Sequence, residues 1–70
     1  MTEAGIELTA DEVVIMLLKD PQHTRFFYAG ETKPIRAEDL VGMDSIYRVK
    51  EVKARMEGPQ YNEDIYLDIV

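Results

Sequence analysis

The sequence contains no cysteine, no tryptophan and a single histidine, His23. Without cysteine the chain can form neither a disulfide framework nor a thiolate metal site, which is typical of a reducing compartment. One histidine cannot build a zinc site, and no calcium-loop spacing is present. The longest apolar run, residues 13–18, has six residues, whereas a membrane span needs about 20. We therefore expect a cytoplasmic protein that uses no metal or cofactor and does not enter a membrane.

Basic residues are also scarce: eight Lys and Arg oppose fourteen Asp and Glu, so the formal charge is −6 over 70 residues. The length fits one domain, residues 1–70, with marginal burial of its own. Acidic residues without any basic ones occupy the N-terminal segment 1–12 and the C-terminal segment 57–70, whereas residues 13–56 are mildly basic. Either the acidic ends fold over a basic face of the same domain, or they present carboxylates to a basic partner.

Turn-forming residues divide the chain into five segments. Residues 24–29 are rich in aromatics and predict a strand, and residues 64–70 alternate apolar and polar side chains as a strand does. Residues 34–41 predict a short helix that ends at Gly42. Residues 45–56 fit a strand paired with 64–70 through a hairpin loop at Gly58-Pro59.

The first segment, residues 9–20, has two interpretations. Thr9 and Glu12 have the spacing of a capping box, and the apolar positions 10, 13, 14, 17 and 18 fit a helical stripe. The β-branched run 13–15 favours a central strand instead. We predict an α+β fold with a small antiparallel sheet of three to four strands and one short helix, in the order β-β-α-β-β. An N-terminal helix is the alternative to the first strand.

Groups suited to catalysis are sparse. The chain has one serine, Ser45, and His23 follows a turn at Asp20-Pro21, where a histidine is usually exposed. Adjacent acids point in different directions and so do not form the paired carboxylates of acid–base catalysis. We therefore predict that the protein is not an enzyme. Segments 25–28 and 47–50 interleave aromatic and basic side chains, which is the pattern of a single-stranded nucleic-acid-binding module, but the charge of −6 argues against it.

One resemblance to a known family is present over residues 12–56. Residues 12–20, then a short turn, then Arg25-Phe26-Phe27-Tyr28, resemble the opening strands of the short dimeric uracil-DNA glycosylase inhibitors encoded by some phages. Residues 35–42 resemble their brief helix ending in glycine, and residues 44–50 resemble their next strand, which carries alternating basic residues. The resemblance implies that residues 12–20, in the first segment, form a strand.

The resemblance also implies a function, that of an acidic protein that mimics DNA. Helix acids would take the positions of phosphates, and a hydrophobic pocket at the seam of a homodimer would hold an apolar side chain of the enzyme. The partner would be uracil-DNA glycosylase in the host cytoplasm. Carried over by position, the phosphate mimics are Glu38 and Asp39, and the pocket residues are Leu40, Val41 and Met43, with Tyr28 and Tyr47 nearby.

Two further functions stay open beside this one. Another phage or prophage inhibitor, directed at a host nuclease or polymerase, would have the same small acidic character. An assembly subunit of a larger particle would also fit a short chain with marginal burial.

Overall fold

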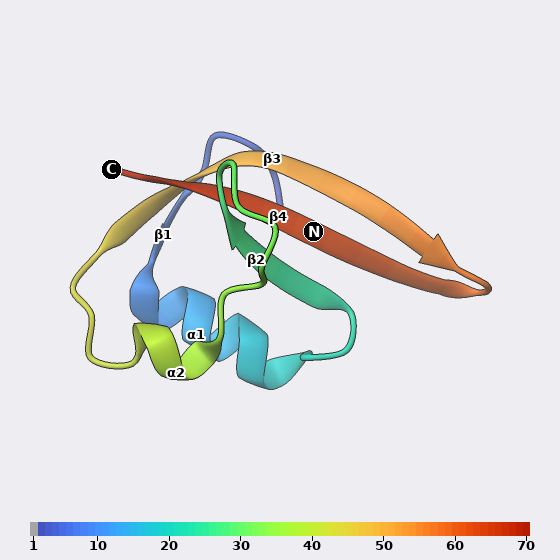
Figure 1. Cartoon of the computed structure of the whole chain (residues 1–70), viewed down its shortest axis with the longest axis horizontal. Coiled ribbons are helices and arrows are strands. Elements are labelled where there is room, and N and C mark those ends of the chain that lie inside the picture. Colours follow the sequence, from blue (N-terminus) through green and yellow to red (C-terminus); the bar gives the residue numbers. More distant parts are fainter. Residues whose placement is uncertain (1) are drawn as a thin grey trace.

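The computed structural model describes residues 2–70 and has an α+β fold in which a four-stranded sheet carries two short helices on one face (Figure 1). The elements are β1 (Glu7–Thr9), α1 (Ala10–Lys19), β2 (Thr24–Tyr28), α2 (Ala37–Leu40), β3 (Ile46–Glu57) and β4 (Gln60–Ile69). The predicted α+β class is confirmed. None of the helices within residues 2–70 is long and apolar enough to cross a membrane.

Residues 10–19 form a helix, so the strand implied there by the resemblance is wrong and the alternative is right. The capping box explains this outcome: the Glu12 amide donates to Thr9 Oγ1 at 3.1 Å, and the Thr9 amide donates to Glu12 Oε1 at 3.0 Å. Both bonds satisfy amides that a new helix leaves without partners. The helix then buries Ala10 and Val13 against the sheet.

The helix cap gives a first prediction. We expect Thr9→Ala to lower the free energy of unfolding by about 1 kcal/mol, because it removes the hydroxyl that accepts from the Glu12 amide. Thermal unfolding followed by circular dichroism measures this change. Thr9→Ser keeps the hydroxyl and is the matched control, so a loss of equal size in Thr9→Ser would contradict the capping explanation.

The sheet has the strand order β1-β3-β4-β2, and it is mixed rather than purely antiparallel as predicted. β1 and β4 pair antiparallel with β3, whereas β2 pairs parallel with β4, with Phe26 opposite Ile65. The hairpin turn makes β3 and β4 antiparallel. The direction of β2 is instead decided by the connection 29–45, which carries the chain through α2 and past the position of β4 to β3, an inner strand between β4 and β1.

The β3–β4 hairpin turns in two residues, Gly58 and Pro59, between the paired residues Glu57 and Gln60. Gly58 has a positive φ of +61°. Pro59, which follows it, has a negative φ because the proline ring fixes that angle. This combination fits a type II′ turn, which matches the twist of the flanking strands. The predicted hairpin is therefore confirmed, and it is longer than expected because β4 begins at Gln60 rather than near residue 64.

The core lies between the sheet and the helices. Its fully buried side chains come from every layer and include Val13, Phe26, Leu40, Tyr47 and Ile65. The loop before α2 completes the core: Ile35 is buried, and its amide donates to the Phe26 carbonyl at 2.7 Å. This bond also covers part of the outer edge of β2, which would otherwise be an open edge.

Candidate protein-binding face

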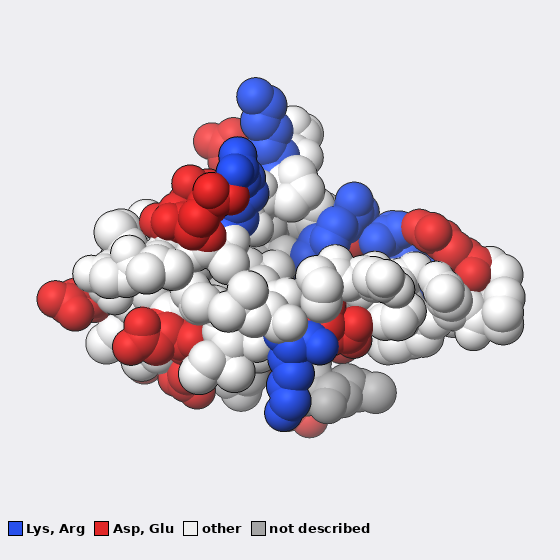
Figure 2. Space-filling view, turned by 90° about the horizontal axis from the view of Figure 1, so that it is seen from below, with Lys and Arg blue, Asp and Glu red and all other residues white. Residues whose placement is uncertain are grey.

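The helical side of the molecule exposes large apolar side chains that the core does not use. Ile15 and Leu18 on α1 are 60% and 71% exposed, and Val41 and Met43, directly after α2, are 68% and 45% exposed. The two helices pack against one another. Figure 2 views this side and shows uncharged surface across its middle. We call these four residues the helical patch.

Acidic residues lie at the end of the molecule where α1 begins (left in Figure 2). Asp11 and Asp44 line a shallow hollow together with Met43. On α2, Glu38 and Asp39 are both exposed, and Glu38 forms an ion pair with Arg36. The Arg36 pairing raises the pKa of that guanidinium, chiefly through the hydrogen bond to Glu38. The helical patch therefore borders on carboxylates from two elements.

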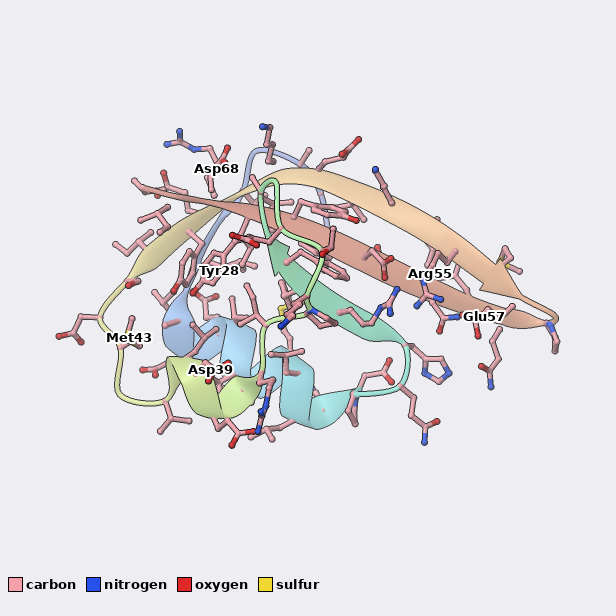
Figure 3. All side chains as sticks on the ribbon, viewed as in Figure 1. Tyr28, Asp39, Met43, Arg55, Glu57 and Asp68 are labelled. Carbon is pink, nitrogen blue, oxygen red and sulfur yellow. The ribbon has the colours of Figure 1, made fainter. Side chains whose placement is uncertain are left out.

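Tyr28 and Tyr47 contact one another, and Tyr28 lies near Asp39 of α2. Their hydroxyl oxygens are 3.4 Å apart, and their ring centroids are separated by 5.9 Å. The hydrogen bond to Tyr47, together with burial and the nearby Asp39, raises the pKa of Tyr28 to about 12. Asp39 and Tyr28 also line one groove beside the loop before α2 (Figure 3).

This tyrosine pair gives a second prediction. In an absorbance titration of the phenolate band, we expect one tyrosine to ionise near pH 12, and Tyr28→Phe to remove that component. Because the pKa of Tyr28 in the folded protein lies above the ordinary tyrosine value of 10.0, the stabilisation is present below pH 10 and is lost as the pH rises toward 12. Tyr61→Phe, at an exposed tyrosine, is the control. Persistence of the late component in Tyr28→Phe would contradict the assignment.

The structure brings together only part of the predicted site. Glu38, Asp39, Val41 and Met43 are exposed around α2, and Tyr28 is partly buried beside them. Leu40 and Tyr47 are 0% and 1% exposed and belong to the core, so neither presents surface to a partner.

The residues that the sequence analysis missed are Ile15, Leu18, Asp11 and Asp44. The helical stripe predicts Leu18 to be buried, but it is 71% exposed. A helical wheel does not find this set, because residues 13–18 are all apolar and the pattern does not say which side of α1 faces the sheet.

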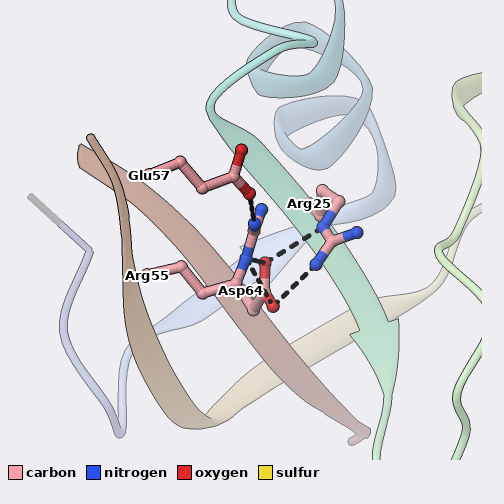
Figure 4. Close-up of polar contacts among 4 residues, drawn as sticks. All are labelled: Arg25, Arg55, Glu57 and Asp64. Atoms are coloured by element: carbon pink, nitrogen blue, oxygen red, sulfur yellow. Dashed lines mark hydrogen bonds and ion pairs between the residues drawn. The ribbon is translucent and has the colours of Figure 1, made fainter. Parts of the chain in front are cut away.

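The other face of the sheet carries no helix and is neutralised by contacts within the chain. Asp64 accepts from Arg25 at 2.9 Å and 3.1 Å and from Arg55 at 3.1 Å, and Arg55 also pairs with Glu57 (Figure 4). Burial alone raises the pKa of Asp64, but the hydrogen bonds from the two arginines outweigh burial and hold it below 3.8.

These contacts bear on the two interpretations of the charge distribution. Arg48 likewise pairs with Glu7 at 2.8 Å. Acids of both chain ends therefore pair with arginines of the middle segment, as the first interpretation expects. The second interpretation, carboxylates presented to a partner, stays open for the acids that border the helical patch.

Aromatic rings on this open face are covered by neighbouring cations. Phe27 and Tyr66 stack with centroids 5.0 Å apart, Arg25 lies over the Phe27 ring at 5.4 Å, and Lys53 lies over Tyr66 at 5.2 Å. A nucleic-acid base could stack here only by displacing a cation from a ring face. Of the two aromatic and basic segments of the sequence, 25–28 therefore pairs its own Arg25 with Phe27, whereas in 47–50 Tyr47 is buried and Arg48 pairs with Glu7.

No protein-family model matches the chain, and no curated protein or solved structure gives a significant match. Within residues 2–70, no three His, Cys, Asp or Glu side chains lie close enough together to hold a metal ion.

Proposed function

We propose that this chain is a small, non-enzymatic inhibitor that binds a basic, DNA-binding surface of a protein partner through its helical patch and the adjoining acids. The observation that supports it most directly is the contrast between the two faces. The helical side exposes four large apolar residues next to carboxylates, whereas the open sheet face pairs its charges internally.

The chemistry of the partner follows from this contrast. Enzymes that grip DNA present cations to phosphates, and several insert an apolar side chain between bases. Asp11, Asp39 and Asp44 offer carboxylates to such cations, and Val41 and Met43 offer apolar contact between them. The buried centre of a protein interface is apolar, with polar groups at its rim, and the helical patch has this composition.

Uracil-DNA glycosylase is the first partner to test, because the resemblance over α2, which includes the acids Glu38 and Asp39, implies it. In a uracil-excision assay, we expect a stoichiometric amount of the protein to abolish cleavage of a uracil-containing oligonucleotide. Full cleavage at a large excess of protein would overturn this target. The same protein is then assayed against host nucleases and DNA polymerases, and inhibition of none of these enzymes would overturn the proposed function as a whole.

A further inference from the structure

The β3–β4 hairpin extends beyond the rest of the fold. The first residue of β4 that pairs with β2 is Glu63, opposite Thr24, so residues 55–62 form a two-stranded segment that pairs with no third strand among the described residues. Figure 1 shows this segment, which we call the arm, projecting past the ends of both helices. The arm accounts for the elongated shape of the molecule, 37 × 22 × 22 Å. A two-stranded hairpin is marginally stable in water without a covering layer.

The side of the arm that continues the core face is apolar and uncovered. Side chains alternate along a strand, so Met56 lies on the same face as Val52, and Tyr61 on the same face as Ile65. Met56 and Tyr61 are direct cross-strand partners, and they are 64% and 48% exposed. Methionine and tyrosine are both enriched in protein interfaces.

The opposite side of the arm is held by charged contacts. Arg55 bridges the buried Asp64 and Glu57, which ties the arm to the sheet. Met56 and Tyr61 are therefore presented on a segment whose position is fixed from the other face. A preorganised surface loses less conformational entropy on binding than a mobile one.

Charge indicates what covers this surface. Residues 55–62 contain one cation, Arg55, and one acid, Glu57, so the remainder of the chain carries the whole formal charge of −6. Two copies of an acidic chain repel one another least when a neutral segment of each, away from the acidic end, forms the contact. A basic partner would instead be drawn to the acidic end of the molecule. A second copy of this chain is therefore the occupant that the charge distribution favours.

We propose that the arm is a self-association surface on which two copies pack their apolar arm faces together, antiparallel, about a two-fold axis. Met56 then contacts Tyr61 of the second copy, and the symmetry repeats the contact. Sulfur–aromatic contacts of this kind are favourable. The surface lies apart from Leu40, Val41 and Met43, where the resemblance implies the dimer seam. It is also independent of the helical patch, which stays exposed in the pair.

Sedimentation of the full chain over a range of concentrations tests the proposal. We expect a mass that rises from one copy to two. The double variant Met56→Lys/Tyr61→Lys should weaken this association about thirtyfold or more, the usual size of a hot-spot loss. The matched control Ile69→Lys/Val70→Lys adds the same charge at two exposed apolar residues and should associate like the parent chain. Added salt should strengthen association, because it screens repulsion between acidic bodies.

The absence of cysteine allows a test of the geometry. Copies with Met56→Cys, mixed with copies with Tyr61→Cys, should form disulfide-linked pairs faster than either variant alone, since the two-fold axis sets position 56 against position 61. A wild-type chain that stays monomeric at every concentration would overturn the proposal. Equal cross-linking of a mixture containing the control Ile69→Cys would overturn it as well. Inhibition assays on the arm variants separate the two proposals. The self-association proposal can fail while the helical patch still inhibits its partner, and the reverse can also happen.

Discussion

Asp64→Asn should lower the free energy of unfolding by about 2–3 kcal/mol, which is a large fraction of the stability expected for a 70-residue chain. Asp64 is only 7% exposed and accepts hydrogen bonds from both Arg25 and Arg55. An asparagine keeps the shape but carries no charge, and its amide group faces one of the guanidinium groups. The midpoint of thermal unfolding should fall by roughly 10–20 °C.

The pH dependence of this difference follows from the lowered pKa of Asp64. A carboxylate with a folded pKa below 3.8 contributes stability above that value and loses it as the pH falls through the folded pKa. The gap between the parent chain and Asp64→Asn should therefore be widest near neutral pH and narrow in acid. Asp68→Asn, at an exposed acid on the same strand, is the matched control. Equal losses in the two variants would show that the network does not stabilise the fold.

Reversing the charges of α2 should have the largest effect on binding. We expect Glu38→Lys/Asp39→Lys to raise the protein concentration needed for half-inhibition of uracil excision about a hundredfold or more, because each change replaces attraction to a basic surface by repulsion. Inhibition by the parent chain should weaken as salt is added, and the variant should show a shallower dependence.

The control for this variant carries the same charge change elsewhere. Glu3→Lys/Glu51→Lys alters two exposed acids away from the helices and should inhibit nearly as well as the parent chain. Circular dichroism verifies that both variants are folded. If the two double variants lost inhibition equally, net charge rather than the helical face would explain binding, and the proposed site would be wrong.

Local signals in the sequence predicted much of the fold. The aromatic run of β2, the helix ending before Gly42 and the turn at Gly58-Pro59 all specify their own conformation. The capping box at Thr9 likewise outweighed the β-branched run after it, because it satisfies two amides at the start of the helix. The parallel pairing of β2 with β4 has no local signal, since it depends on where the connection 29–45 returns to the sheet.

The same distinction, between local signals and long-range packing, applies to the residues of the candidate site. Glu38 and Asp39 could be predicted as exposed acids because charged side chains are rarely buried without a partner. The burial of Leu40 and Tyr47 could not be predicted, because it depends on α1 packing beside α2 over the sheet. The exposure of Ile15 and Leu18 depends likewise on which side of α1 faces the sheet. That choice is made by tertiary packing rather than by residue type.

The position of β4 has a consequence for synthesis of the protein in the cell. β4 lies between β3 and β2 in the sheet and contributes Ile65 and Leu67 to the core, yet the other three strands of this sheet are all translated before it. The β2 strand, with Phe26, must therefore wait through some forty residues of chain before its neighbour exists. Such sequence-distant pairing slows folding. We expect the sheet to stay incomplete on the ribosome until Ile69 has left the exit tunnel.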